Sequence, residues 1–81
     1  MSTITKTFTS TGQTMPDYAR PGATVTYSAP DGCVLRRSAD MQAWQDVATP
    51  SPFVHDGSPA HYRIDCDTYE GTPKVATLEI E

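Results

Sequence analysis

The sequence predicts an all-β protein, a small antiparallel β-sandwich or barrel of about seven short strands, Ig-like or jelly-roll-like. Three observations lead to this class. Apolar and polar residues alternate with a period of two in several short segments. Clusters of Pro, Gly, Asp and Ser separate these segments at a spacing of roughly ten residues. No stretch repeats apolar residues at helical spacing. The chain is expected to form one domain, residues 1–81.

The first expected strand, residues 2–10, has two very different faces. Ile4, Lys6 and Phe8 share one face, and threonine occupies every odd position from 3 to 9 on the other. Threonine favours extended backbone because it is branched at Cβ. One weakly apolar face and one hydroxyl face predict an edge strand, or a strand that pairs with something outside the domain.

Residues 11–22 are expected to be a loop, because proline and glycine punctuate them. A strand follows at residues 23–29. Pro30 and Gly32 belong to a tight-turn signature, so this strand is expected to form a β-hairpin with residues 33–38.

The middle of the chain is expected to organise the fold. Ser38 and Asp40 are turn formers, whose side chains cap a turn by hydrogen bonds to the backbone. A strand over residues 43–49 follows this turn. Leu35 and Trp44 are the largest apolar residues in this region, so both are expected in the core.

Three strands complete the predicted fold, at residues 53–55, 60–69 and 74–81. A hairpin turn at residues 70–73 is expected to join the last two. The inward side chains are expected to be Tyr62, Ile64, Cys66, Thr68, Ala76, Leu78 and Ile80. The outward side chains are expected to be Arg63, Asp65, Asp67, Tyr69, Val75, Thr77 and Glu79.

Charge and hydropathy exclude several classes of partner. The formal net charge is −4, and only Arg36 and Arg37 among the six basic residues are adjacent. Neighbours in a strand point to opposite faces, so no basic stripe forms and nucleic-acid binding is not expected. No apolar run approaches the ~20 residues that span a bilayer, and no signal peptide is recognisable, so synthesis in a reducing cytoplasm is expected.

Cys33 and Cys66 are too few for a disulfide framework. They fall in two predicted strands, where a disulfide across a sandwich would form if the Cα atoms came within about 7 Å. Two buried thiols are favoured over this disulfide, because disulfides are rare in a reducing compartment.

Candidate chemical sites are few, and no cofactor or metal is expected. His55, Asp56 and His61 could hold a divalent metal, but their spacing matches no metal motif, so loop residues are favoured. Acidic residues in 65–70 could bind calcium, but a polar strand face is favoured. No serine lies in a glycine-flanked nucleophile elbow and no glycine-rich phosphate loop is present. The sequence therefore predicts a protein that is not an enzyme.

The segment Leu35-Arg36-Arg37-Ser38-Ala39-Asp40, followed by Trp44, resembles the L-x-R-S-x-D-x-x-x-W hairpin of small β-sandwich proteins encoded among tailed-bacteriophage structural genes. The flanking segments Ile4-Thr5-Lys6-Thr7-Phe8-Thr9, Val25-Thr26-Tyr27 and Tyr62-Arg63-Ile64-Asp65-Cys66 are similar to the same pattern. Ser38, Asp40 and Trp44 are also similar to the Asp-box turn of sialidase propellers, but the glycine and threonine before the tryptophan are missing.

The phage resemblance implies a non-enzymatic virion component, namely a capsid decoration or cement protein. It would be made in the host cytoplasm and would lie on the capsid surface, bound to the major capsid protein. A homo-oligomer clustered at capsid symmetry axes is implied as well. The residues expected to make contacts are Ile4, Lys6, Phe8, Tyr18, Arg20, Arg36, His55 and Tyr69.

Two other classes remain open. A carbohydrate-binding or adhesion module, such as a head-fibre or tail-associated domain, would carry exposed aromatic residues on one face with nearby Asp, Asn or Gln. A small inhibitor that blocks a host enzyme through an acidic surface would fit the net charge of −4.

Overall fold

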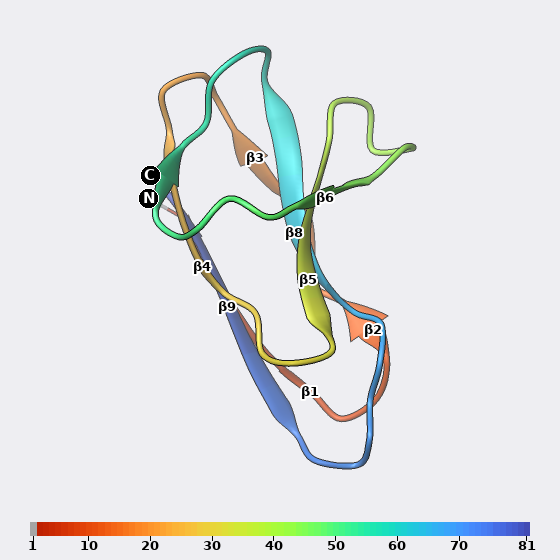
Figure 1. Ribbon diagram of the computed structural model, residues 1–81. Helices are drawn as coiled ribbons and strands as arrows, with labels where there is room; N and C mark the ends of the chain where they lie inside the picture. Colours follow the sequence, from red (N-terminus) through yellow and green to blue (C-terminus); the bar gives the residue numbers. More distant parts are fainter. Residues whose placement is uncertain (1) are drawn as a thin grey trace.

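The computed structural model describes residues 2–81, which fold into two packed antiparallel sheets (Figure 1). The arrangement is a β-sandwich and not a closed barrel, as the four-stranded and five-stranded sheets remain separate. The strands are β1 (Ser2–Phe8), β2 (Gly12–Gln13), β3 (Asp17–Ala19), β4 (Thr24–Ser28), β5 (Cys33–Ser38), β6 (Gln45–Val47), β7 (Phe53–Val54), β8 (Ala60–Cys66) and β9 (Lys74–Ile80).

The strand order explains how the two layers are built. The four-stranded sheet has the order β1-β9-β4-β7, and the five-stranded sheet has the order β2-β8-β5-β6 with β3 also paired to β8. The predicted all-β sandwich is confirmed, and so is the place of β1 at a sheet edge. The predicted loop at residues 11–22 is wrong in part, because β2 and β3 lie within it. Both are too short to show an alternating pattern, and both are held by pairing with β8.

The core lies between the sheets and is filled by alternate residues of the longer strands. Every second residue of a strand faces the same side, so β8 and β9 each give one apolar row. The inward rows predicted for these two strands are confirmed for Tyr62, Ile64, Cys66, Ala76, Leu78 and Ile80. The other large buried side chains include Phe8, Val25 and Leu35.

Both predicted hairpins are wrong, because their turns carry the chain from one sheet to the other. β4 belongs to the four-stranded sheet and β5 to the five-stranded sheet, and β8 and β9 are divided in the same way. The turn before β5 does form, since the Cys33 N–H donates to the Pro30 carbonyl at 2.9 Å. Turn chemistry is local, so it does not specify whether the next strand pairs beside the previous one or crosses to the facing sheet.

Gly32 is required by this crossing for two reasons. Its φ is +86°, and a Cβ atom there would lie 2.4 Å from the Thr68 carbonyl oxygen. The Gly32 carbonyl in turn accepts hydrogen bonds from the N–H groups of Asp67 and Thr68 at 2.9 and 3.2 Å. The glycine therefore lets the crossing loop pack directly against the chain that leaves β8.

The polar turn after β5 has the predicted capping bonds. The Ser38 hydroxyl accepts from the Met41 N–H at 2.9 Å, and one Asp40 oxygen accepts from the Gln42 and Ala43 N–H groups at 2.8 and 3.1 Å. These backbone donors, together with the Ser38 hydroxyl, lower the pKa of the Asp40 carboxyl. Ser38 and Asp40 thus shape the turn, as predicted.

The prediction that Trp44 anchors the core is wrong. Trp44 is only half-buried and lies outside the core cluster. Val47 packs against the core instead, directly opposite Leu35 in the β5–β6 ladder. Leu35 is 1% exposed, so its predicted place in the core is confirmed.

The two thiols are free, and they lie opposite each other in neighbouring strands of the same sheet. They are therefore not placed across the sandwich. Burial, followed by a hydrogen bond to Cys66, raises the pKa of the Cys33 thiol from 9.0 to about 11. A thiol whose pKa is raised in the folded state contributes to the stability of that state at pH values below its ordinary pKa of 9.0. This stabilising contribution is lost as the pH rises through about 11.

Slow alkylation of Cys33 in the folded protein is the expected result of this raised pKa. The thiolate is the nucleophile, so a pKa higher by about two lowers the reactive fraction about 100-fold at neutral pH. Mass spectrometry after timed iodoacetamide treatment should show this rate rising between about pH 8 and 11. Protein unfolded in guanidinium is the control. Equal rates in folded and unfolded protein at neutral pH would contradict the expectation.

In residues 2–81 there is no helix that is long and apolar enough to cross a membrane.

Candidate functional site

The outer face of the five-stranded sheet carries the main concentration of polar and aromatic side chains. Tyr62, Ile64 and Cys66 point into the core, so the alternate residues of β8 point outward. Side chains from the neighbouring strands complete this surface. We define the binding face as Gln13, Tyr18, Arg36, Trp44, Asp46, His61, Arg63, Asp65 and Asp67.

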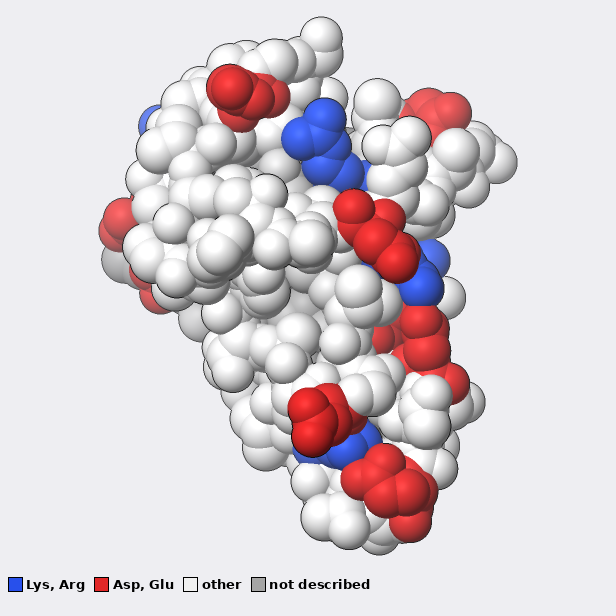
Figure 2. Space-filling model, in the orientation of Figure 1, with Lys and Arg blue, Asp and Glu red and all other residues white. Residues whose placement is uncertain are grey.

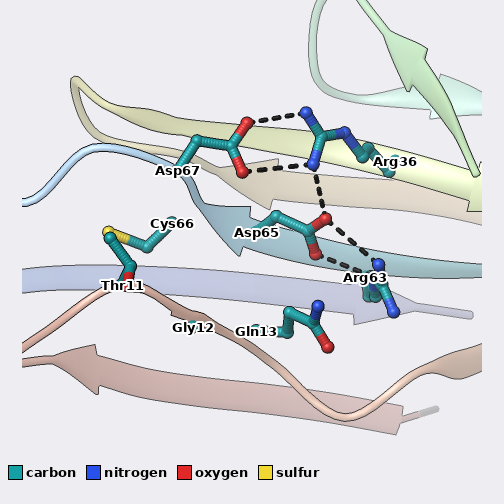
Figure 3. Close-up of a pocket in the computed structure, with 8 residues that line it drawn as sticks. All are labelled: Thr11, Gly12, Gln13, Arg36, Arg63, Asp65, Cys66 and Asp67. Atoms are coloured by element: carbon teal, nitrogen blue, oxygen red, sulfur yellow. Dashed lines mark hydrogen bonds and ion pairs between the residues drawn. The ribbon is translucent and has the colours of Figure 1, made fainter.

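Arg36 lies at the centre of the binding face and forms three ion pairs. Figure 3 shows the pairs with Asp65 and Asp67. Its guanidinium nitrogens lie 2.8 Å from Asp46, 2.7 Å from Asp65 and 2.6 Å from Asp67. The Asp67 contact uses both carboxylate oxygens, which fixes the plane of the guanidinium group. Hydrogen bonds to Asp46, Asp67 and Asp65 raise the pKa of Arg36, so it stays charged.

Asp65 joins Arg36 to a second arginine. Arg36 and Arg63 lie directly opposite each other in the β5–β8 ladder, where two like charges would repel. The Asp65 carboxylate lies between them, 2.7 Å from Arg36 Nη1 and 2.7 Å from Arg63 Nε. Asp65 lies in the outward row of β8, as predicted, but its side chain is only 3% exposed, so the predicted solvent exposure is wrong. The sheet tolerates this buried carboxylate because both arginines neutralise it.

Aromatic rings flank the ion pairs. The Arg63 guanidinium carbon lies 4.1 Å from the centroid of the Trp44 ring, in a cation–π contact. Tyr18 and His61 form an edge-to-face pair with centroids 5.6 Å apart. Tyr18 is 53% exposed, so its ring is available to a partner. The binding face thus combines rigid charged groups with aromatic surface.

A hollow of about 410 Å³ opens beside the ion pairs. Figure 3 shows that Gln13 enters it from β2, across from Asp65 and Arg63 on β8. Arginine and aspartate neutralise each other there, so the hollow presents hydrogen-bond donors and acceptors with little net field. Its lining comprises Thr11, Gly12, Gln13, Arg36, Arg63, Asp65, Cys66 and Asp67.

Charges of both signs are interleaved on the molecular surface. Figure 2 shows acidic and basic side chains alternating down the side of the molecule where β5 and β6 lie, next to a largely uncharged area. An interleaved surface favours a partner with its own mixture of charged and polar groups over a uniformly charged one.

The residues predicted to contact a partner do not lie together. Tyr18 and Arg36 belong to the binding face, and Arg20 is exposed at the end of β3. Ile4 is half-buried and Lys6 is exposed on β1, at the edge of the other sheet. The predicted contacts are thus divided between two surfaces.

Three of the residues predicted to contact a partner are not openly exposed in the isolated chain. Phe8 and His55 are each 1% exposed, and Tyr69 is half-buried against the core. His55 Nε2 lies 2.8 Å from the Ser58 carbonyl and Nδ1 lies 2.8 Å from the Tyr62 hydroxyl. A carbonyl only accepts, so Nε2 donates to Ser58, while Nδ1 and the Tyr62 hydroxyl share the second hydrogen bond. This histidine is buried because both of its ring nitrogens have partners.

Most of the side chains considered for metal binding form hydrogen bonds or ion pairs with other residues. The ring nitrogens of His55 are occupied, and Asp65 and Asp67 are paired with arginine. Glu70 pairs with Lys74 at 2.7 Å. Among residues 2–81, no group of three or more His, Cys, Asp or Glu side chains is arranged to hold a metal ion.

Sequence reasoning missed the contributions of Gln13, Trp44, His61 and Arg63 to the binding face. The outward alternation of β8 contained the signal for His61 and Arg63. Gln13 lies in a strand of two residues, which has no periodicity to detect. The prediction that Trp44 lies in the core rests on its size alone, which is a weak argument for a residue that is seldom fully buried.

Fold and site together define a small antiparallel β-sandwich protein with an open, ion-paired and aromatic sheet face. Comparison with protein-family models, with curated proteins and with solved structures finds no match to this chain.

Proposed function

We propose that this chain is a non-enzymatic structural protein of a tailed-bacteriophage virion, which decorates the capsid by binding the major capsid protein. The observation that carries a binding role is the gathering of Trp44, Tyr18, Arg36 and Arg63 on one sheet face. Trp, Tyr and Arg are the residue types that dominate the energetics of protein–protein interfaces. The phage assignment rests on the resemblance of the segment from Leu35 to Trp44.

The arrangement of the binding face suits a stable interface. Ion pairs and stacking already restrict Arg36 and Arg63, so little side-chain entropy is lost on association. Several copies on the capsid surface, clustered at symmetry axes, would bury area across capsomer boundaries. Because they bind the assembled shell, mass action then stabilises it against disassembly.

Binding to capsids that lack the protein tests the proposal. Wild-type protein is expected to co-sediment with such capsids and raise their melting temperature, and Trp44→Ala is expected to weaken binding roughly 30-fold. Val75→Ala, which changes an exposed apolar residue on the other sheet, is the matched control and should bind like wild type. Absence of the chain from purified virions by mass spectrometry would refute the assignment.

A carbohydrate-binding module is the second candidate, and one observation favours it. Tyr18 and Trp44 share their face with Gln13 and Asp67, next to the hollow. Aromatic rings beside carboxylate and amide groups suit sugar recognition. One face of the Trp44 ring is covered by Arg63, however, which leaves Tyr18 as the more available ring. Clear hits on a glycan array, without capsid binding, would favour this candidate over the first.

A further inference from the structure

The outer edge of β1 is the longest free strand edge in residues 2–81. β1 pairs with β9 along seven residues, and no other strand within residues 2–81 lies on its outer side. The strands at the other sheet ends, β2, β6 and β7, have only two or three residues each. A long free edge presents a row of unpaired backbone groups, which is a template for another chain.

The ladder on the far side of β9 shows which backbone groups of β1 are free. Thr24 and Glu81 exchange two hydrogen bonds of 3.0 Å, so the N–H and C=O of Glu81 point towards β4. Directions alternate along a strand, so Ile80 and every second residue before it point towards β1. Their β1 partners are therefore the residues that bond to β9, namely Ser2, Ile4, Lys6 and Phe8.

The remaining residues of β1 direct their N–H and C=O groups away from β9, in the plane of the sheet. These residues are Thr3, Thr5 and Thr7, and all three are exposed. The edge that a partner would meet is thus a row of three threonines. Each offers one backbone donor and one acceptor, and its side chain lies on the outer face of the sheet.

This row is complementary to itself. An antiparallel second copy, related by a two-fold axis at Thr5, places Thr5 opposite Thr5 and Thr3 opposite Thr7. Each threonine pair would exchange two backbone hydrogen bonds, and cross-strand threonine pairs add favourable side-chain contacts. On the inner face Ile4 falls opposite Lys6, so no two like charges face each other. A two-fold interface needs this self-complementarity.

Charge also favours a second copy at this edge. The whole chain has a net charge of −4, so two copies repel each other over much of their surface. β1 contains no acidic residue, and its one charged side chain is Lys6. A groove of about 380 Å³ runs beside the edge between Ile4 and the 76%-exposed Met15. In the two-fold arrangement, the alkyl part of Lys6 from the second copy would lie at the mouth of this groove.

We propose that β1 is a homodimerisation edge, through which two copies join antiparallel about Thr5 and unite their four-stranded sheets. The proposal does not depend on capsid binding, because it uses the other sheet. It also leaves the binding face open in both copies, so the dimer would present two such faces to a partner.

Charged substitutions of opposite sign at the two-fold position test the dimer directly. Wild-type protein is expected to show a concentration-dependent dimer in sedimentation velocity. Thr5→Lys and Thr5→Glu each place like charges opposite each other, so each variant alone should dimerise roughly tenfold more weakly or worse. An equimolar mixture of the two should regain the dimer. Thr26→Lys and Thr26→Glu, exposed changes on the inner strand β4, are the matched controls and should dimerise like wild type.

A backbone variant provides the second measurement. Thr5→Pro removes the outward N–H of Thr5 without touching the bonds to β9, so the folded variant should remain monomeric. Thermal unfolding reports whether each variant is folded. If Thr5→Pro does not fold, the Thr5→Lys and Thr5→Glu variants still test the proposal. Wild-type protein that stays monomeric at about 100 µM overturns the proposal. So does a dimer that survives in Thr5→Lys, or a mixture that fails to restore it.

Discussion

Replacing Asp65 by alanine is expected to destabilise the protein by about 3–5 kcal/mol, as for other buried ion pairs that lose one partner. The carboxylate lies 2.7 Å from both Arg36 and Arg63, whose side chains are only 23% and 17% exposed. Its removal leaves Arg63 without its carboxylate partner, directly opposite Arg36 and with limited access to water, while Arg36 keeps Asp46 and Asp67. The free energy of unfolding from urea titrations measures the loss.

Two variants make the Asp65 result interpretable. Asp65→Asn keeps the size of the side chain and removes its charge, so a loss close to that of the alanine variant would show that charge is the cause. Asp46→Ala removes another partner of Arg36, but that carboxylate is 70% exposed, and a loss below about 1 kcal/mol is expected. Similar losses for Asp46→Ala and Asp65→Ala would mean that burial of the carboxylate does not matter.

Phe8→Ala is expected to lower the free energy of unfolding by about 3–5 kcal/mol, the usual loss for a buried aromatic side chain. Phe8 is 1% exposed and ends β1, where its ring packs in the core beside Gly12. Removing it leaves a cavity and loosens the attachment of β1 to the sandwich. Denaturant unfolding followed by circular dichroism measures the effect.

The neighbouring Lys6→Ala variant is the control for Phe8→Ala. Lys6 lies on the same face of β1 but is exposed, and its ammonium group is 5.6 Å from the Phe8 ring centroid. A loss below about 1 kcal/mol is expected, because an exposed cation–π contact contributes little. A Phe8→Ala variant as stable as Lys6→Ala would contradict the expectation that Phe8 contributes to the core.

The inward and outward rows of the long strands could be predicted from the sequence, because alternation is a local property that burial enforces. The Ser38–Asp40 turn could be predicted for the same reason, since its hydrogen bonds join residues within five positions. The partner of each strand could not be predicted. Pro30 and Gly32 specify a turn, but the choice between a hairpin and a crossing depends on which distant strand covers the apolar row.

The burial of two polar side chains, Asp65 and His55, could not be predicted because it depends on their partners in the fold. Asp65 is buried because Arg36, 29 positions away, neutralises it. His55 is buried because Tyr62 and Ser58 satisfy both ring nitrogens. A polar residue taken by itself is assigned to the surface, and only its partners in the fold can change that assignment.

The crossing turns also have a consequence for the order of folding. They leave the chain few adjacent strand pairs, and the longest ladder joins Ser2 to Ile80. Closing a loop of that length loses conformational entropy before the contacts are gained, and all-β folds of this kind fold in milliseconds to seconds. We expect β1 to dock only after β9 has paired with β4. On this expectation, the edge that would receive a second copy forms only after β9 and β4 have paired.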